Sequence, residues 1–304
     1  MALPDPDCDP VAVFATAMAA AEPFERAPDL AVALSGGADS TCLSILAASW
    51  AAARGGRVVA LTVDHGLRSG SAAEAEQVAR ACAARGLRHV VLGWTGAKPS
   101  RAIQERARDA RHALLEAWCR DAGILHLLLG HHADDQAETI AMRAARKSGT
   151  IGLAGMAMIA ERRHVRLLRP LLGLSAARIR SWLSARGEAW IEDPSNRDPR
   201  FLRSHLRAEG TPQPQPVRGD MDRAAVERSL ALWFARHAAI HPEGWIALGR
   251  DAFAALPAAT AALVLRAAVM TIAGSIHPPR QRQLEQARDW LRGDAGGGQG
   301  RDFA

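Results

Sequence analysis

Short apolar runs separated by longer amphipathic stretches dominate the first part of this sequence. Five of these runs are rich in Val, Leu and Ala and have few polar interruptions. A continuous apolar run of this length is typical of a strand that is covered on both faces of its sheet. The predicted strands are Leu30–Leu34, Val58–Val63, His89–Leu92, His126–Leu129 and Val165–Arg169.

The longer stretches between these runs have the apolar spacing and the charged faces of helices. The predicted helices are Ser40–Arg54, Ser71–Arg85, Ala102–Ala122 and Ala133–Lys147. Strands that alternate with helices predict βαβ units, and therefore a Rossmann-like α/β fold: a mainly parallel sheet with helices on both faces. In such sheets ligands bind at the carboxyl ends of the strands, near a topological switch point.

The α/β pattern ends near the stretch AEGTPQPQPVRGD, Ala208–Asp220, whose prolines and glycines cannot continue a helix or a central strand. Helical patterns return at Arg223–His237, Ala258–Ala273 and Arg280–Arg292. We therefore expect a small, mostly helical C-terminal domain. The predicted domains are a helical or irregular lead-in over residues 1–27, an α/β domain over 28–210, a helical domain over 216–292 and a disordered tail over 293–304.

The chain is basic, with 38 Lys and Arg against 32 Asp and Glu and a formal net charge of +6. This balance favours a polyanionic partner, although a general preference for arginine would produce the same excess.

Its four cysteines lie far apart without a CxxC pair, which argues against a disulfide framework or a structural zinc site. No apolar run approaches the roughly 18–20 residues of a membrane span, and the first residues lack the layout of a secretion signal. We expect a cytoplasmic protein without a membrane partner, and a homodimer stays open.

The first predicted strand leads directly into Ser35-Gly36-Gly37-Ala38-Asp39-Ser40 and then into a helix. Glycines let backbone N–H groups approach a ligand closely, and the start of the helix adds a partial positive charge. The two serines add hydroxyl donors, so the loop is a candidate phosphate cradle. The carboxylate of Asp39 fits such a site if Mg²⁺ lies between it and the phosphate. The alternative is that Asp39 or Ser40 caps the helix.

A second polar cluster, in GHHADDQAET, follows the fourth predicted strand. Its members are His131, His132, Asp134, Asp135 and Glu138, at the start of a helix. The histidines are suited to phosphate contact or proton transfer, and Asp135 is placed to complete a Mg²⁺ site with Asp39. The alternative is that Asp134 caps the helix while Asp135 favours the helix dipole.

Other candidates accompany these two loops. Asp64 and His65 follow the second predicted strand, where a turn stabilised by Asp64 is the alternative to a binding role. Arg108 and Arg111 are three residues apart on one predicted helix, and Arg203 and Arg207 lie four apart in an Arg-rich segment. Guanidinium groups suit phosphates and carboxylates, although a solvated charged face is the alternative.

These strings together resemble a known family. SGGADS is similar to the pyrophosphate loop of the PP-loop ATP pyrophosphatases. With LTVDHGLRSGSAAEA, RARDARH, LGHHADDQAETIAMR, RPLLGL and IEDPSNRDPRFLRSHLR, it resembles the tRNA(Ile)-lysidine synthetase family, over about residues 28 to 207. The resemblance implies an enzyme that uses ATP to adenylate the wobble cytidine of a CAU-anticodon tRNA(Ile). The amine of free L-lysine then displaces AMP, and the product is lysidine.

The resemblance also implies roles for individual residues. Asp39, His132, Asp135 and Glu138 would be catalytic, with Mg²⁺ held by Asp39 and Asp135 and the lysine ammonium received by Glu138. Lysine and tRNA binding would involve Arg108, Arg111, Glu138, Arg203 and Arg207. ATP would be bound by Ser35, Gly36, Gly37, Ala38, Asp39, Ser40, Val63, Asp64, His65 and Gly130.

Three positions depart from the family pattern as this resemblance describes it. Lys147 replaces a glycine, Ser204 replaces an asparagine, and His205 is not a simple substitute for the family's residue. Two other functions stay open. One is a tRNA thiolase of the same superfamily, which would need reactive cysteines, and the other is a nucleotide-binding or RNA-binding module without catalysis.

Overall fold

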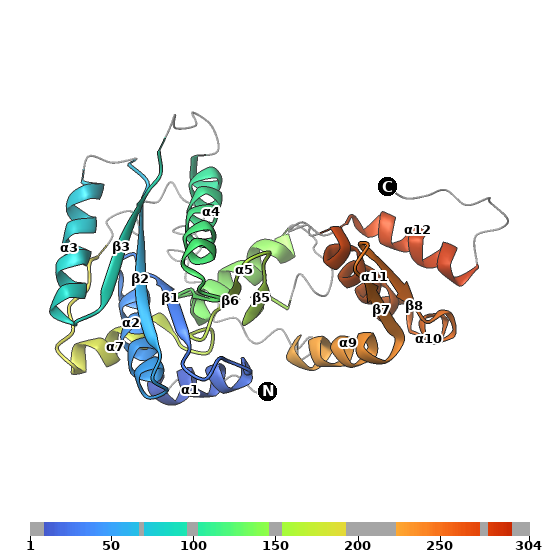
Figure 1. Cartoon of the computed structure of the whole chain (residues 1–304), viewed down its shortest axis with the longest axis horizontal. Coiled ribbons are helices and arrows are strands. Elements are labelled where there is room, and N and C mark those ends of the chain that lie inside the picture. Colours follow the sequence, from blue (N-terminus) through green and yellow to red (C-terminus); the bar gives the residue numbers. More distant parts are fainter. Residues whose placement is uncertain are drawn as a thin grey trace. The chain divides into compact units, whose positions relative to one another are not determined.

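The computed structural model describes residues 9–66, 70–95, 103–145, 154–192, 223–273 and 279–293. Contacts between residues divide the chain into two compact units, Met1–Gly219 and Asp220–Ala304, and each is described by itself (Figure 1). Within the described ranges, no helix combines the length and the apolar character that crossing a bilayer requires.

The first unit alternates strands and helices along most of its length. Its elements are α1 (Pro10–Ala20), β1 (Asp29–Ala33), α2 (Ala38–Ala52), β2 (Arg57–Asp64), α3 (Ser71–Ala84), β3 (Arg88–Gly93), α4 (Ile103–Ala122), β4 (His126–Leu128), α5 (Ala133–Ala145), β5 (Ile159–Glu161), β6 (Arg166–Leu168) and α7 (Ala176–Ala185).

The six strands form one sheet in the order β3-β2-β1-β4-β6-β5. β1 pairs in parallel with β2 on one side and with β4 on the other, so that Val32 is aligned with Ala60 and with Leu128. The next two strands along the chain, β2 and β3, therefore lie on one side of β1, and the later strands β4, β6 and β5 lie on the other side. The switch point lies between β1 and β4. The crevice outside the carboxyl ends of these two strands is where this class of sheet binds ligands.

Alternate residues of the central strands enter two different cores, which explains why the strands read as continuous apolar runs. On one face, Leu30 and Val32 join a cluster that includes side chains of α1, α2 and α7. On the other face, Ala31 packs with Leu115 and Cys119 of α4.

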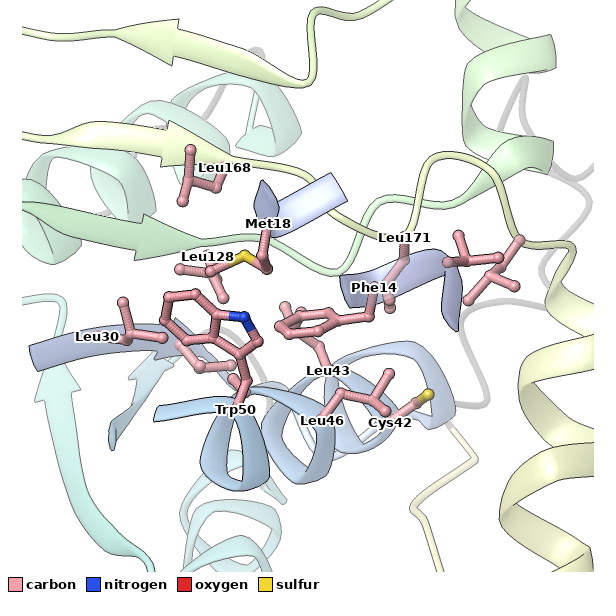
Figure 2. Close-up of a cluster of buried hydrophobic side chains, with 14 of the residues drawn as sticks. Phe14, Met18, Leu30, Cys42, Leu43, Leu46, Trp50, Leu128, Leu168 and Leu171 are labelled. Atoms are coloured by element: carbon pink, nitrogen blue, oxygen red, sulfur yellow. The ribbon is translucent and has the colours of Figure 1, made fainter. Parts of the chain in front are cut away.

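Helix α1 is fixed to the first of these cores by large side chains. Figure 2 shows Phe14 and Met18 pointing toward Trp50 of α2 and toward Leu128 of β4. Phe14 and Met18 are 2% and 1% exposed, and full burial of such a side chain contributes roughly 1.5–3 kcal/mol. The lead-in of the chain is therefore an integral part of the first unit.

The predicted Rossmann-like α/β fold is confirmed, and each predicted strand and helix of this unit is present within a few residues of its expected bounds. Two elements were not predicted. β5 is an antiparallel edge strand of three partly exposed residues, too short to give a pattern. The N-cap of α7 is Ser175, whose side chain accepts a hydrogen bond from the Arg178 N–H at 3.2 Å, so the capping residue was a signal available in the sequence.

The second unit is mostly helical, as expected, with a two-stranded hairpin added. Its elements are α9 (Arg223–His237), β7 (Ala238–His241), β8 (Trp245–Leu248), α10 (Arg250–Ala254), α11 (Ala258–Ala273) and α12 (Gln281–Arg292). Phe253, Val264 and Leu284 lie at the centre of its core. The hairpin turns at Gly244, whose φ of +91° needs a glycine, but its alanine-rich strands gave no strand pattern.

Candidate active site

The loops that follow β1 and β4 meet at the switch point of the sheet. Gly130, just after β4, approaches the first turn of α2 so closely that a Cβ there would lie 3.2 Å from the Asp39 carbonyl carbon and from the Ser40 nitrogen. A glycine at this position therefore lets the two loops touch through their backbones. The predicted phosphate cradle and the predicted acidic cluster are neighbours for this reason.

The cradle between β1 and α2, residues 35–40, is called the PP loop from here on. Gly36 has a φ of +85°, in the left-handed region that favours glycine. A Cβ there would lie 2.7 Å from Val78 Cγ2 and 2.9 Å from Ile191 Cδ1. The Gly36 carbonyl accepts a hydrogen bond from the Ile191 N–H at 2.8 Å. Gly36 is therefore needed for the conformation of the loop itself.

Serine hydroxyls hold the PP loop from inside. The Ser35 N–H donates to Ser40 Oγ at 3.2 Å, and Ser40 Oγ donates to the Gly37 carbonyl at 3.0 Å. Gly37 is the N-cap of α2 and has no side chain with which to satisfy the first N–H groups. Neither Asp39 nor Ser40 is the N-cap, so the capping alternative raised by the sequence does not account for Asp39. The open helix start is suited to an anion.

His132, which is 4% exposed, lies among three carboxylates. Its Nε2 is 3.6 Å from Asp39 Oδ2 and 3.5 Å from Asp135 Oδ2, while its Nδ1 is 3.2 Å from Asp134 Oδ2. Burial opposes the charged imidazolium, but the three carboxylates outweigh it and raise the pKa of His132. Electrostatic attraction to His132 thus links Asp39 of the PP loop to Asp135 at the start of α5.

The three carboxylates of this cluster have different partners. The Asp134 carboxylate accepts the Ala176 N–H at 2.7 Å, so it serves the start of α7, and its contact with His132 and this bond hold the pKa of Asp134 at about 2. Asp135 accepts the His132 N–H at 3.1 Å. Burial raises the pKa of Asp39, as does Asp135, whereas His132 and Arg180 act in the opposite direction.

The pair formed by Asp39 and Asp135 fits a Mg²⁺ ion that shares its ligands with phosphate. Asp39 Oδ1 is buried and has no hydrogen-bond partner among the described residues. In those same residues, no group of three or more His, Cys, Asp or Glu is arranged to hold a metal. Mg²⁺ bound through one or two carboxylates, waters and substrate phosphates needs no such protein-only cage.

Glu138 lies on α5, one turn after Asp134, and is 3% exposed. Its neighbour Gln136, which the sequence did not single out, makes two hydrogen bonds to Met156, from Nε2 to the carbonyl at 3.0 Å and from the Met156 N–H to Oε1 at 2.6 Å. Arg143 adds a bond from Nη1 to the Gly155 carbonyl at 2.7 Å. These bonds hold residues 155–156 against the helix that carries Glu138.

A set of arginines, called here the cationic cluster, acts on His131 and on His112 of α4. It comprises Arg108 and Arg111 of α4 together with Arg162 and Arg169. Burial first, and then the arginines, lower the pKa of His131 to about 3 and that of His112 to about 4. The Nδ1 atoms of both imidazoles are buried and without a hydrogen-bond partner in the described part of the chain. Two neutral imidazoles among arginines are suited to an anionic ligand.

The turn after β2 is held locally. Asp64 Oδ1 accepts the Gly66 N–H at 2.8 Å, and the Asp64 carbonyl accepts the Trp94 N–H at 2.9 Å. The His65 ring meets the Trp94 ring edge-on at 5.9 Å. Asp64 therefore stabilises the local turn, which was the alternative to a binding role. Val63 and Asp64 are half-buried at the carboxyl end of β2, beside the PP loop strand.

Five positions singled out in the sequence lie outside the described residues, namely Lys147, Arg203, Ser204, His205 and Arg207. Three cysteines are described, and all are free and buried in helices. Burial raises the pKa of the Cys42 and Cys119 thiols to about 12, which makes them poor nucleophiles.

Comparison with known proteins gives matches over the part of the chain that carries this candidate site. A family model described as the PP-loop domain matches residues 12–213. A tRNA(Ile)-lysidine synthase from Hyphomonas neptunium is 41% identical over 267 residues, which cover 84% of this chain and 72% of that protein. A second, from a Bradyrhizobium species, is 48% identical over 188 residues, 61% of this chain and 52% of that protein. The chain therefore spans only about half the length of that relative.

Among solved structures, the U34-tRNA thiolase NcsA from Methanococcus maripaludis, with its 4Fe-4S cluster, superposes with a TM-score of 0.55. The match covers 65% of this chain and 71% of that one at 15% identity, so it concerns the fold alone. The PP-loop match over residues 12–213 and the long match to the Hyphomonas protein show that the chain belongs to the tRNA(Ile)-lysidine synthase family.

Proposed function

We propose that this protein ligates lysine to the wobble cytidine of a CAU-anticodon tRNA(Ile). In the first step, the C2 carbonyl oxygen of cytidine attacks the α-phosphorus of ATP, and pyrophosphate leaves. In the second step, the lysine amine attacks C2, releases AMP and forms lysidine. The observation that supports this best is the meeting of the PP loop with the acidic cluster around His132 at the switch point.

The PP loop would hold the β,γ-phosphates on the open start of α2. Asp39 and Asp135 would hold Mg²⁺, which supplies charge neutralisation for the departing pyrophosphate when it is bound. His132 lies between the two carboxylates, because its Nε2 is 3.6 Å from Asp39 Oδ2 and 3.5 Å from Asp135 Oδ2. Val63, Asp64 and His65 would border the adenosine part of ATP.

The acceptor side of the site would be formed by the cationic cluster and α5. Arg108 and Arg111 would contact the phosphodiester next to the wobble cytidine, because an arginine fork matches phosphate geometry. Glu138 would receive an ammonium group of lysine. Arg203 and Arg207 belong to the same proposal, and the structure does not describe them. The second unit would contact tRNA away from the anticodon, with Arg236 and Arg250 exposed for such contacts.

The decisive experiment incubates the purified chain with ATP, labelled lysine and CAU-anticodon tRNA(Ile), followed by digestion and mass spectrometry of nucleosides. We expect lysidine to form, with one AMP released per lysidine. Omission of ATP and replacement of the anticodon by CAC are the controls. A thiolated nucleoside would support the thiolase, and ATP or tRNA binding without any new nucleoside would support a non-catalytic module. The buried thiols described above weigh against the thiolase.

A further inference from the structure

The PP loop is poor in positive side chains for a site that would hold a triphosphate. Residues 35–40 contain no lysine or arginine, so the loop offers only backbone N–H groups and hydroxyls. The arginines of the cationic cluster act on His131 and His112, on the acceptor side of the site. In such a site, a cationic side chain would stabilise the negative charge of the departing pyrophosphate in addition to Mg²⁺ and the start of α2.

Helix α7 is attached to the site at its first residues. The Asp134 carboxylate accepts the Ala176 N–H at 2.7 Å, and the Ala133 N–H donates to the Leu174 carbonyl at 2.8 Å. Further along, Ile179 and Leu183 are fully buried in the core that α7 shares with α2. Helix α7 is therefore fixed both to the loop after β4 and to the helix that begins at the PP loop.

Arg180 lies one turn after Ala176 on this fixed helix, and it is exposed. Its charge acts on Asp39 of the PP loop, where it lowers the pKa of the carboxylate. In the described part of the first unit, the Arg180 guanidinium has neither an ion pair nor a side-chain hydrogen bond. By contrast, the guanidinium of Arg186, the C-cap of the same helix, lies over the Trp182 ring at 4.6 Å from its centroid.

We propose that Arg180 is a substrate-binding residue that contacts the β,γ-phosphates of ATP and then the departing pyrophosphate. The proposal rests on the proposed function, in which the PP loop binds those phosphates. A guanidinium is always charged and offers a planar fork of donors that fits two phosphate oxygens at once. Because its helix is fixed at the site, Arg180 needs to order only its own side chain when ATP arrives.

The test measures binding of inorganic pyrophosphate, MgATP and AMP to the full chain by calorimetry. The variants are Arg180→Gln, Arg180→Lys and the control Arg178→Gln, which removes the same charge two residues earlier on the same helix. Loss of a charged hydrogen-bonding group typically weakens binding roughly 10- to 100-fold.

We expect Arg180→Gln to weaken pyrophosphate and MgATP binding by roughly this factor while AMP binding and the melting temperature stay unchanged. Arg180→Lys should fall between Arg180→Gln and the wild type, and Arg178→Gln should resemble the wild type. Unchanged pyrophosphate binding in Arg180→Gln would overturn the inference and leave the proposed function intact, as would an equal loss for AMP. A wild-type chain that binds neither ATP nor pyrophosphate would overturn both.

Discussion

The two glycines of the PP loop are adjacent, yet the structure predicts different consequences for an alanine at each. At Gly36, alanine would have to adopt a φ of +85°, which costs roughly 1–2 kcal/mol for a residue with a Cβ. The new Cβ would also lie 2.7 Å from Val78 and 2.9 Å from Ile191, and overpacking of this kind costs roughly 1–3 kcal/mol. We therefore expect Gly36→Ala to lower the free energy of unfolding by roughly 2–5 kcal/mol.

Gly37→Ala is the matched control, because Gly37 has a φ of −68° and the nearest atom to an added Cβ is Ser35 Oγ at 3.7 Å. Alanine is a poorer N-cap than glycine by roughly 0.5–1 kcal/mol. It also lowers the conformational entropy of the unfolded chain, which stabilises the folded state by a similar amount. The stability of this variant should therefore stay close to that of the wild type. Its methyl group would border the open start of α2, so MgATP binding should weaken.

Urea denaturation followed by tryptophan fluorescence measures the stability of both variants, and calorimetry measures MgATP binding. Thermal melting should agree, with Gly36→Ala lowered by roughly 4–20 °C for a unit of this size. A Gly36→Ala chain as stable as the wild type would refute the requirement for a left-handed residue at this position. Equal destabilisation by both substitutions would refute the distinction between a glycine needed for folding and one needed for the ligand.

Three further predictions concern the acidic residues. Asp39→Asn should keep the fold and lower turnover by roughly 10²–10³-fold in a kinetic assay, because the Mg²⁺ ligand is lost; normal turnover would contradict a metal role. Glu138→Gln should raise the lysine KM or abolish transfer while lysine-independent attachment of AMP to tRNA persists, and equal loss of both half-reactions would reject the lysine role. Asp134 has a pKa held at about 2, so its contacts stabilise the folded state above the unfolded pKa near 3.8 and are lost as pH falls through 2. The stability difference between the wild type and Asp134→Asn, from urea titrations at several pH values, should thus be largest near pH 6 and shrink below pH 4; a difference independent of pH would contradict this.

The parts of the molecule that repeat a simple pattern could be predicted from the sequence, and the parts that depend on distant contacts could not. Strands β1, β2, β4 and β6 place residues in cores on both faces of the sheet, so each carries its own apolar run, and β3 carries one although it is a partly exposed edge strand. β5 is an edge strand without such a run, and its pairing with β6 depends on the rest of the sheet.

The candidate site shows the same division. The spacing of SGGADS and GHHADD identified both loops, because the carboxyl ends of parallel strands share one edge of the sheet. Nothing in the spacing could place Asp134 against α7, more than 40 residues later in the chain, or bring Arg180 near Asp39. Gln136 was missed because its two bonds to Met156 satisfy a backbone segment whose position only the folded chain defines.

The stretch from Leu174 to Ile191 has a consequence for how this family can change over evolutionary time. Its first residues bond to Ala133 and Asp134 beside the acidic cluster, and its last bonds to Gly36 in the PP loop. The stretch therefore works as a brace of fixed length between the two walls of the nucleotide crevice. Substitutions along its exposed side leave that span intact, whereas an insertion or deletion would release one of its ends. Natural variation here should accordingly be rich in amino-acid exchanges and poor in changes of length.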